Sequence, residues 1–85
     1  MKQRVREIIA DNTGIDVDAL GDQGDLWQAG MASKAAVRVM LEIEEEFELE
    51  FPPESMSQAS FATVDAITAA VEPLVGSASA GVTAA

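Results

Sequence analysis

The strongest constraint on the fold is the spacing of apolar residues between positions 33 and 47. Five of them recur at intervals of three and four residues: Ala36, Val39, Met40, Ile43 and Phe47. This is the period of an α-helix that buries one face. Val37 and Leu41, four residues apart, lie on a second face among charged side chains. A helix needs only one apolar face for its core, so we expect this pair to be exposed and to form a docking surface.

Two other segments have the same period. The first helix is predicted over residues 2–12, with Gly14 as its stop, and the last begins after the N-cap Thr63 and ends by Gly76. Their predicted core residues are Val5, Ile8 and Ile9 in the first, and Val64, Ile67, Val71 and Leu74 in the last. Because the chain has no cysteine, its fold must rest on apolar burial without disulfides.

The segments between these helices are rich in turn-forming residues. Residues 13–32 carry four glycines and predict a long first loop, held down by the apolar side chains of Ile15, Leu20, Leu26 and Trp27. After Pro52-Pro53, which blocks a helix, residues 54–59 predict a short helical turn. The sequence therefore predicts an all-α fold, a small four-helix bundle with three main helices, one short helix and a long first loop. We expect residues 1–75 to form this domain and residues 76–85, which are small and uncharged, to form a flexible tail.

The charge distribution limits the kinds of partner. The net charge is −10, and residues 39–85 hold nine acidic residues without one lysine or arginine. Nucleic-acid binding is therefore not expected. The expected partner is a protein with a basic patch. The sequence has neither the apolar core of a signal peptide nor an uncharged run long enough to cross a membrane, so we expect the protein to be cytoplasmic. We also expect it to be a monomer.

Ser33 is the most informative polar residue. It follows a glycine-bearing turn, opens the helix and has no histidine or cysteine anywhere in the chain to assist it. A Ser-His-Asp triad is thus excluded, and Lys34 is poorly placed as a base because adjacent helical residues diverge. An ordinary helix N-cap is the alternative interpretation. We expect no catalytic and no metal site, since Asp16, Asp18, Asp22 and Asp25 also lack the spacing of a calcium-binding loop.

The stretch from Asp25 to Ile67 resembles the acyl carrier proteins, small acidic four-helix modules that bear a 4′-phosphopantetheine arm. The resemblance lies in the runs DLWQAGMAS (25–33), MLEIEEEFELEFP (40–52) and FATV (61–64). It implies that Ser33 carries the arm. It also implies a docking surface on the helix that follows, made by Val37, Arg38, Leu41, Glu44 and Glu45. We expect Lys34 to be part of the same surface.

Two positions depart from the family pattern. Ala32 stands where an aspartate usually precedes the serine, and Lys34 where an apolar residue usually follows it. Lys34 and Arg38 add cations to a surface that is normally acidic, which favours a dedicated set of partners. Within the family, the chain most resembles the stand-alone aminoacyl carrier proteins, which are loaded by synthetase-like ligases. Discrete carrier proteins of natural-product pathways share much of the same sequence.

The sequence thus predicts a carrier that holds an aminoacyl or acyl group as a thioester on the arm. The chain has no thiol of its own, and the arm would supply one. The expected partners are a phosphopantetheinyl transferase and a loading ligase or acyl- or aminoacyltransferase with a basic docking patch. The alternative is an acidic interaction module without covalent cargo, which the charge alone supports. An enzyme is not expected.

Overall fold

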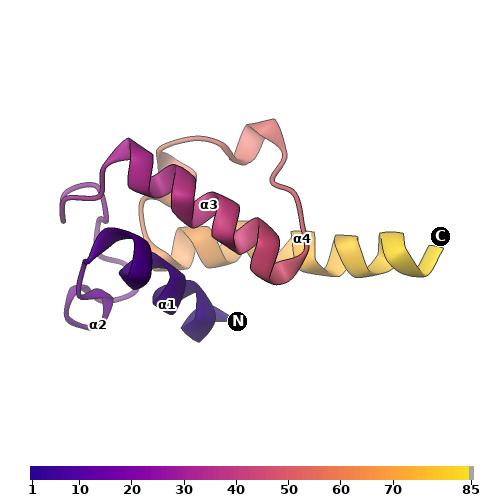
Figure 1. The fold of residues 1–85 in the computed structure, drawn as a ribbon, viewed down its shortest axis with the longest axis horizontal. Helices are drawn as coiled ribbons and strands as arrows, with labels where there is room; N and C mark the ends of the chain where they lie inside the picture. The colour runs from indigo at the N-terminus through magenta and orange to yellow at the C-terminus, as the bar shows by residue number, and fades with distance from the viewer. Residues whose placement is uncertain (85) are drawn as a thin grey trace.

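The chain folds into helices joined by turns in the computed structural model, which describes the backbone of residues 1–84 and the side chains of residues 1–75 (Figure 1). Its elements are α1 (Lys2–Thr13), α2 (Val17–Leu20), α3 (Ser33–Phe47), the 3₁₀ turns η1 (Pro53–Ser55) and η2 (Ala59–Phe61), and α4 (Val64–Ala84). Within residues 1–84 there is no strand. The predicted all-α fold with three main helices and one short helix is confirmed.

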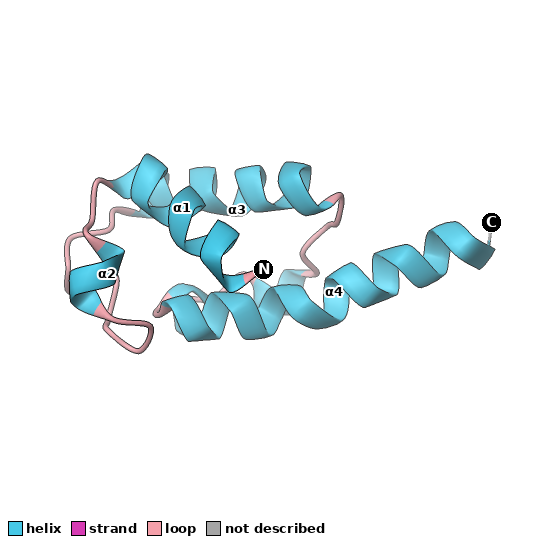
Figure 2. Cartoon of the chain, turned by 90° about the horizontal axis from the view of Figure 1, so that it is seen from below, coloured by secondary structure: helices cyan, strands magenta, loops and turns pink. Residues whose placement is uncertain are grey.

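The three main helices enclose one apolar core. α1 packs against both α3 and α4, and Figure 2 shows α3 along one side of the molecule and α4 along the other, with α1 running obliquely from one to the other. The side chains that fill the space between them are fully buried: Val5, Ile8, Ile9, Leu26, Ile43, Val64, Ile67 and Val71. The core residues predicted for the first helix are confirmed, as are three of the four in the last, Leu74 being only half-buried.

The two faces of α3 are as the apolar spacing predicts. Val39 and Ile43 are buried, while Met40 and Phe47 are half-buried at the edge of the core. Val37 and Leu41 are 50% and 53% exposed. One face of α3 therefore packs into the core, and the other exposes an apolar pair to solvent.

The predicted helix boundaries hold at two ends and fail at a third. Gly14 ends α1 in the left-handed conformation with φ 74°, and the Thr63 hydroxyl accepts a hydrogen bond of 2.9 Å from the Ala66 N–H at the start of α4. The predicted end of the last helix by Gly76 is wrong, because α4 continues to Ala84. One glycine weakens a helix by only about 1 kcal/mol, and the alanines after it are strong helix formers. The division into a domain of residues 1–75 and a flexible tail of residues 76–85 stays a prediction, and Ala85 lies outside the described residues.

The short helix is not where the sequence predicted a helical turn. It is α2, inside the long first loop, where the Asp16 carboxylate accepts from the Ala19 N–H at 3.2 Å and Gly21 ends the helix with φ 87°. Four residues are too few to show a period. The single turn expected over residues 54–59 is instead divided between η1 and η2.

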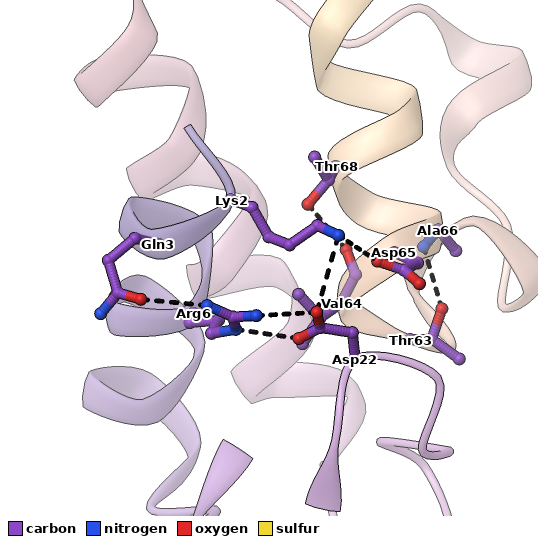
Figure 3. Close-up of polar contacts among 9 residues, drawn as sticks. All are labelled: Lys2, Gln3, Arg6, Asp22, Thr63, Val64, Asp65, Ala66 and Thr68. Carbon is purple, nitrogen blue, oxygen red and sulfur yellow. Dashed lines mark hydrogen bonds and ion pairs between the residues drawn. The ribbon is translucent and has the colours of Figure 1, made fainter. Parts of the chain in front are cut away.

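A cluster of charges joins the first loop to α1 and α4, and we call it the polar clasp: Lys2, Arg6, Asp22 and Asp65 (Figure 3). The Arg6 guanidinium donates two hydrogen bonds to the Asp22 carboxylate, at 2.8 and 2.7 Å. Lys2 Nζ lies 2.8 Å from Asp65 Oδ1 and 3.6 Å from Asp22 Oδ2. The Asp65 N–H also donates to the Asp22 carbonyl, at 3.0 Å. The clasp therefore fixes the middle of the first loop, ahead of the turn that leads to Ser33.

The polar clasp should make stability depend on acid. Hydrogen bonding to Arg6 lowers the pKa of Asp22. The contribution of Asp22 to stability is therefore full above its unfolded pKa of about 3.9 and is lost as the pH falls through the lower folded value. We expect Asp22→Asn to lower the melting temperature at pH 7, and the difference from wild type to shrink below about pH 4.

Asp11→Asn is the matched control, since it removes one negative charge from an exposed position on α1. It should leave the melting curve nearly unchanged at both pH values. Equal effects of the two substitutions at pH 7 would show that net charge, and not the clasp, sets this part of the stability.

Candidate functional site

Ser33 is the first residue of α3, with its side chain exposed. The N-cap is Ala32, whose methyl group cannot cap, and the Ala36 N–H donates to the Ala32 carbonyl at 3.0 Å. The alternative interpretation of Ser33 as the N-cap is therefore wrong. Among the described side chains, the Ser33 hydroxyl forms no hydrogen bond. Because this hydroxyl neither caps the helix nor forms another hydrogen bond, it is accessible for modification.

The turn before α3 explains why the serine is displayed. Gly30 has φ 110°, a conformation that a side chain would strain. The Met31 N–H donates to the Leu26 carbonyl at 3.0 Å, and both side chains are buried in the core. The turn is thus anchored to the core by Leu26 and Met31. The next two residues, Ala32 and Ser33, are exposed to solvent.

The start of α3 suits a phosphate ester. The first N–H groups of an α-helix have no partner within the helix, and the helix dipole places partial positive charge there. With Ala32 as the N-cap, no side-chain hydrogen bond caps this helix end among the described residues. The exposed hydroxyl and the uncapped helix end fit a phosphate attached at Ser33.

A small apolar pocket adjoins Ser33, with a volume of about 230 Å³. It lies between the start of α3, the indole of the first loop and the segment between η1 and η2, and its lining residues are Trp27, Ser33, Ala36, Val37, Met40, Met56, Ser57, Gln58 and Phe61. Trp27 Nε1 donates to the Gln58 carbonyl at 2.9 Å, which closes one wall. The sequence did not reveal this pocket, because residues 53–61 have no period that shows which side chains point inward.

The cations of the chain divide into two groups. Lys2, Arg4 and Arg6 on α1 all form ion pairs with acidic residues. Lys34 and Arg38 on α3 are exposed and form no ion pair with any described side chain. Their charges are therefore presented to solvent beside Ser33 and Val37. Their role in partner binding stays a prediction.

The acidic residues of α3 are not equivalent. Glu44 is half-buried, and its Oε2 accepts a hydrogen bond of 2.9 Å from the Phe51 N–H. Glu46 Oε1 accepts from Arg4 at 2.9 Å, and Glu42 Oε1 from Asn12 at 2.9 Å. Two of these acids were predicted to bind a partner. Glu45 is exposed, whereas the Glu44 carboxylate already accepts a hydrogen bond from the backbone that follows α3.

Two further kinds of site receive no support from the described part of the chain. It contains no group of acidic side chains arranged to hold a metal ion. None of its helices combines the length and the apolar character that a membrane span requires.

Residues 3–71 match the family described as the phosphopantetheine attachment site. The chain belongs to this family. The cofactor predicted from the sequence, phosphopantetheine, is thereby confirmed, and so is the function of a carrier.

Three carrier proteins are similar to this chain in sequence or structure. An aminoacyl carrier protein of Agrobacterium fabrum is 42% identical over 69 residues, covering 79% of this chain and 83% of its own. A D-alanyl carrier protein of Lactobacillus helveticus is 33% identical over 73 residues, covering 86% and 92%. A carrier protein from Agrobacterium tumefaciens has been solved in complex with an engineered Bradyrhizobium japonicum glycine:[carrier protein] ligase and AMP. It superimposes with a TM-score of 0.79 at 40% identity, covering 85% of this chain and 99% of its own.

The two neighbouring acids of this phosphopantetheine attachment domain should respond differently to truncation. Glu44→Ala removes the carboxylate that holds the Phe51 N–H, so it should lower the free energy of unfolding by about 1–2 kcal/mol. Glu45→Ala changes an exposed side chain and should shift it by less than about 0.5 kcal/mol. Urea unfolding of both variants measures the difference. Equal stabilities would mean that the Glu44 contact contributes nothing to the fold.

Proposed function

We propose that this chain carries an aminoacyl group as a thioester on a phosphopantetheine arm attached to Ser33. The observation that carries the proposal is the exposed, uncapped hydroxyl at the first residue of α3, in a chain of the phosphopantetheine attachment family. The cargo is proposed from the relatives, two of which are named for aminoacyl or D-alanyl groups.

The other described serines support Ser33 as the attachment position. The hydroxyls of Ser57 and Ser60 form a hydrogen bond of 3.0 Å with each other, and Ser57 Oγ also accepts from the Ser60 N–H at 3.2 Å. Ser55 is half-buried in η1. Only Ser33 among them stands at the start of a helix longer than one turn, where a phosphate meets free N–H groups.

The partners follow from the chemistry of the arm and from one relative. A phosphopantetheinyl transferase must attach the arm, and we propose that an amino acid:carrier-protein ligase loads it, because a similar carrier forms a complex with a glycine ligase. The docking surface is proposed to comprise Val37 and Leu41 for apolar contact, with Lys34, Arg38, Glu44 and Glu45 around them. A basic patch on the ligase would match Glu45, while Lys34 and Arg38 would select against uniformly basic partners. The chain is proposed to act as a cytoplasmic monomer without catalytic activity.

The attachment is tested by intact mass. Incubation with a phosphopantetheinyl transferase, Mg²⁺ and coenzyme A should add one arm to the wild type and none to Ser33→Ala. Circular dichroism of Ser33→Ala should be nearly unchanged, because the side chain makes no cap that the substitution could remove. Ser60→Ala is the control and should gain one arm. A modified Ser33→Ala would reassign the site, and an unmodified wild type would favour the acidic interaction module.

The docking surface is tested by the rate of aminoacylation of the holo protein with a glycine or alanine ligase. Leu41→Ala should slow loading several-fold while stability changes little, because the side chain is 53% exposed. Arg38→Glu should also slow loading by a dedicated ligase. Ile43→Ala should behave oppositely and lose about 2–5 kcal/mol of stability, because its side chain is fully buried. Equal rates for wild type, Leu41→Ala and Arg38→Glu would place the docking surface elsewhere.

A further inference from the structure

The pocket beside Ser33 lies between the core and the proposed docking surface, since its wall includes the buried Phe61 and the exposed Val37. Among the residues of its wall are two of the most exposed large apolar side chains in the described part of the chain, Val37 at 50% and Met56 at 54%. They come from α3 and from the residue after η1, on either side of the hollow. Apolar side chains that face an open hollow gain stability when an apolar group covers them.

The position of Ser33 identifies the group that can reach the pocket. Ser33 is itself part of the wall, so anything esterified to its hydroxyl begins at the rim. In the phosphopantetheine arm the phosphate is followed by a short carbon segment that carries two methyl groups, and the amides and the thiol come after it. The methyl-bearing segment is therefore the apolar part nearest to the pocket.

The size of the pocket agrees with this segment and excludes the whole arm. A cavity of about 150 Å³ suffices to bind benzene, whereas pockets for drug-sized ligands begin at about 300 Å³. The pocket here, at about 230 Å³, fits a branched segment of a few carbons. The far end of the arm, with its thiol, would then remain outside and accessible to a loading enzyme.

We propose that the pocket of Trp27, Val37, Met40, Met56 and Phe61 receives the methyl-bearing segment of the arm and so holds its near end against the protein. The proposal rests on the proposed attachment at Ser33. Tethering favours the contact, because the segment is always within reach and no free ligand must be captured from solution. The near end is thereby held in place, while the thiol end is free to turn toward a partner.

Trp27 provides the readout, because it is the single tryptophan of the chain and lies in the wall of the pocket. Conversion of the wild type from apo to holo, confirmed by intact mass, should shift Trp27 emission to shorter wavelength and reduce quenching by acrylamide. Both effects arise because the segment displaces water from the indole. Unchanged emission and quenching in fully converted protein would overturn the proposal. Incomplete conversion, seen by mass, would instead count against the attachment itself.

Val37→Asp and Leu41→Asp form a matched pair. Both positions are about half exposed on one face of α3, one turn apart, but only Val37 lines the pocket. In mass-confirmed holo protein, Val37→Asp should lose the Trp27 shift and Leu41→Asp should keep it, since an apolar segment that covered the new carboxylate would strip it of water. Met56→Asp should lose the shift as well, which tests the wall from a second element should Val37→Asp misfold. Retention of the shift in both pocket variants would contradict the proposal.

Two controls separate the segment from other causes of a change at Trp27. Ser33→Glu places a negative charge at the helix start without an apolar segment, and it should leave Trp27 emission and quenching as in the apo wild type. If Ser33→Glu reproduces the holo shift, charge alone explains it and the proposal fails. A shift that appears in the apo protein on raising its concentration, with none on conversion, would assign the pocket to a second copy and also overturn the proposal.

Discussion

The structure depends first on the packing of one face of α3 against α1. Val39 and Ile43 are buried together with Val5, Ile8 and Ile9, and this contact fixes the axis on which Ser33 stands. The chain has no cysteine to form a disulfide, so a domain this small has few other sources of rigidity. Because the buried face is complete, the opposite face of α3 can leave Val37 and Leu41 in water, where they are available to a partner. One helix thus supplies the core, the attachment residue and the proposed docking surface.

The charged residues fall into two groups, those that form ion pairs or hydrogen bonds within the fold and those that remain exposed near Ser33. The cations of α1 pair with acids of the first loop, α3 and α4, so they reduce the repulsion that a net charge of −10 creates. Asp22 in the polar clasp and Glu44 in the last turn of α3 likewise form hydrogen bonds within the molecule. What remains for partners is a mixed surface near Ser33, with Lys34, Arg38 and Glu45 exposed. This differs from a uniformly acidic face, and it agrees with the proposal of a dedicated ligase.

The sequence predicted the elements whose residues repeat often enough to show a period. The two faces of α3 and the core of α1 followed from spacing, because burial imposes that spacing. The Thr63 cap followed from the preference of threonine for the N-cap position. α2 escaped prediction because four residues show no period, and α4 passed Gly76 because a single glycine is a weak stop. The pocket could not be predicted, since it joins Trp27 to residues 56–58 through a contact between a side chain and a backbone carbonyl far apart in the sequence. Carrier function followed from resemblance, whereas the free hydroxyl of Ser33 became visible only with Ala32 as the N-cap.

The most direct measurement of the central claim is peptide mapping of the modified wild-type protein. Trypsin cleaves after Arg6, Lys34 and Arg38, and the fragment of residues 7–34 contains Ser33 as its only serine. All other serines, at positions 55, 57, 60, 77 and 79, fall in the fragment of residues 39–85. If Ser33 carries the arm, tandem mass spectrometry will find the mass of phosphopantetheine on residues 7–34 alone. The same mass on residues 39–85 would contradict the account.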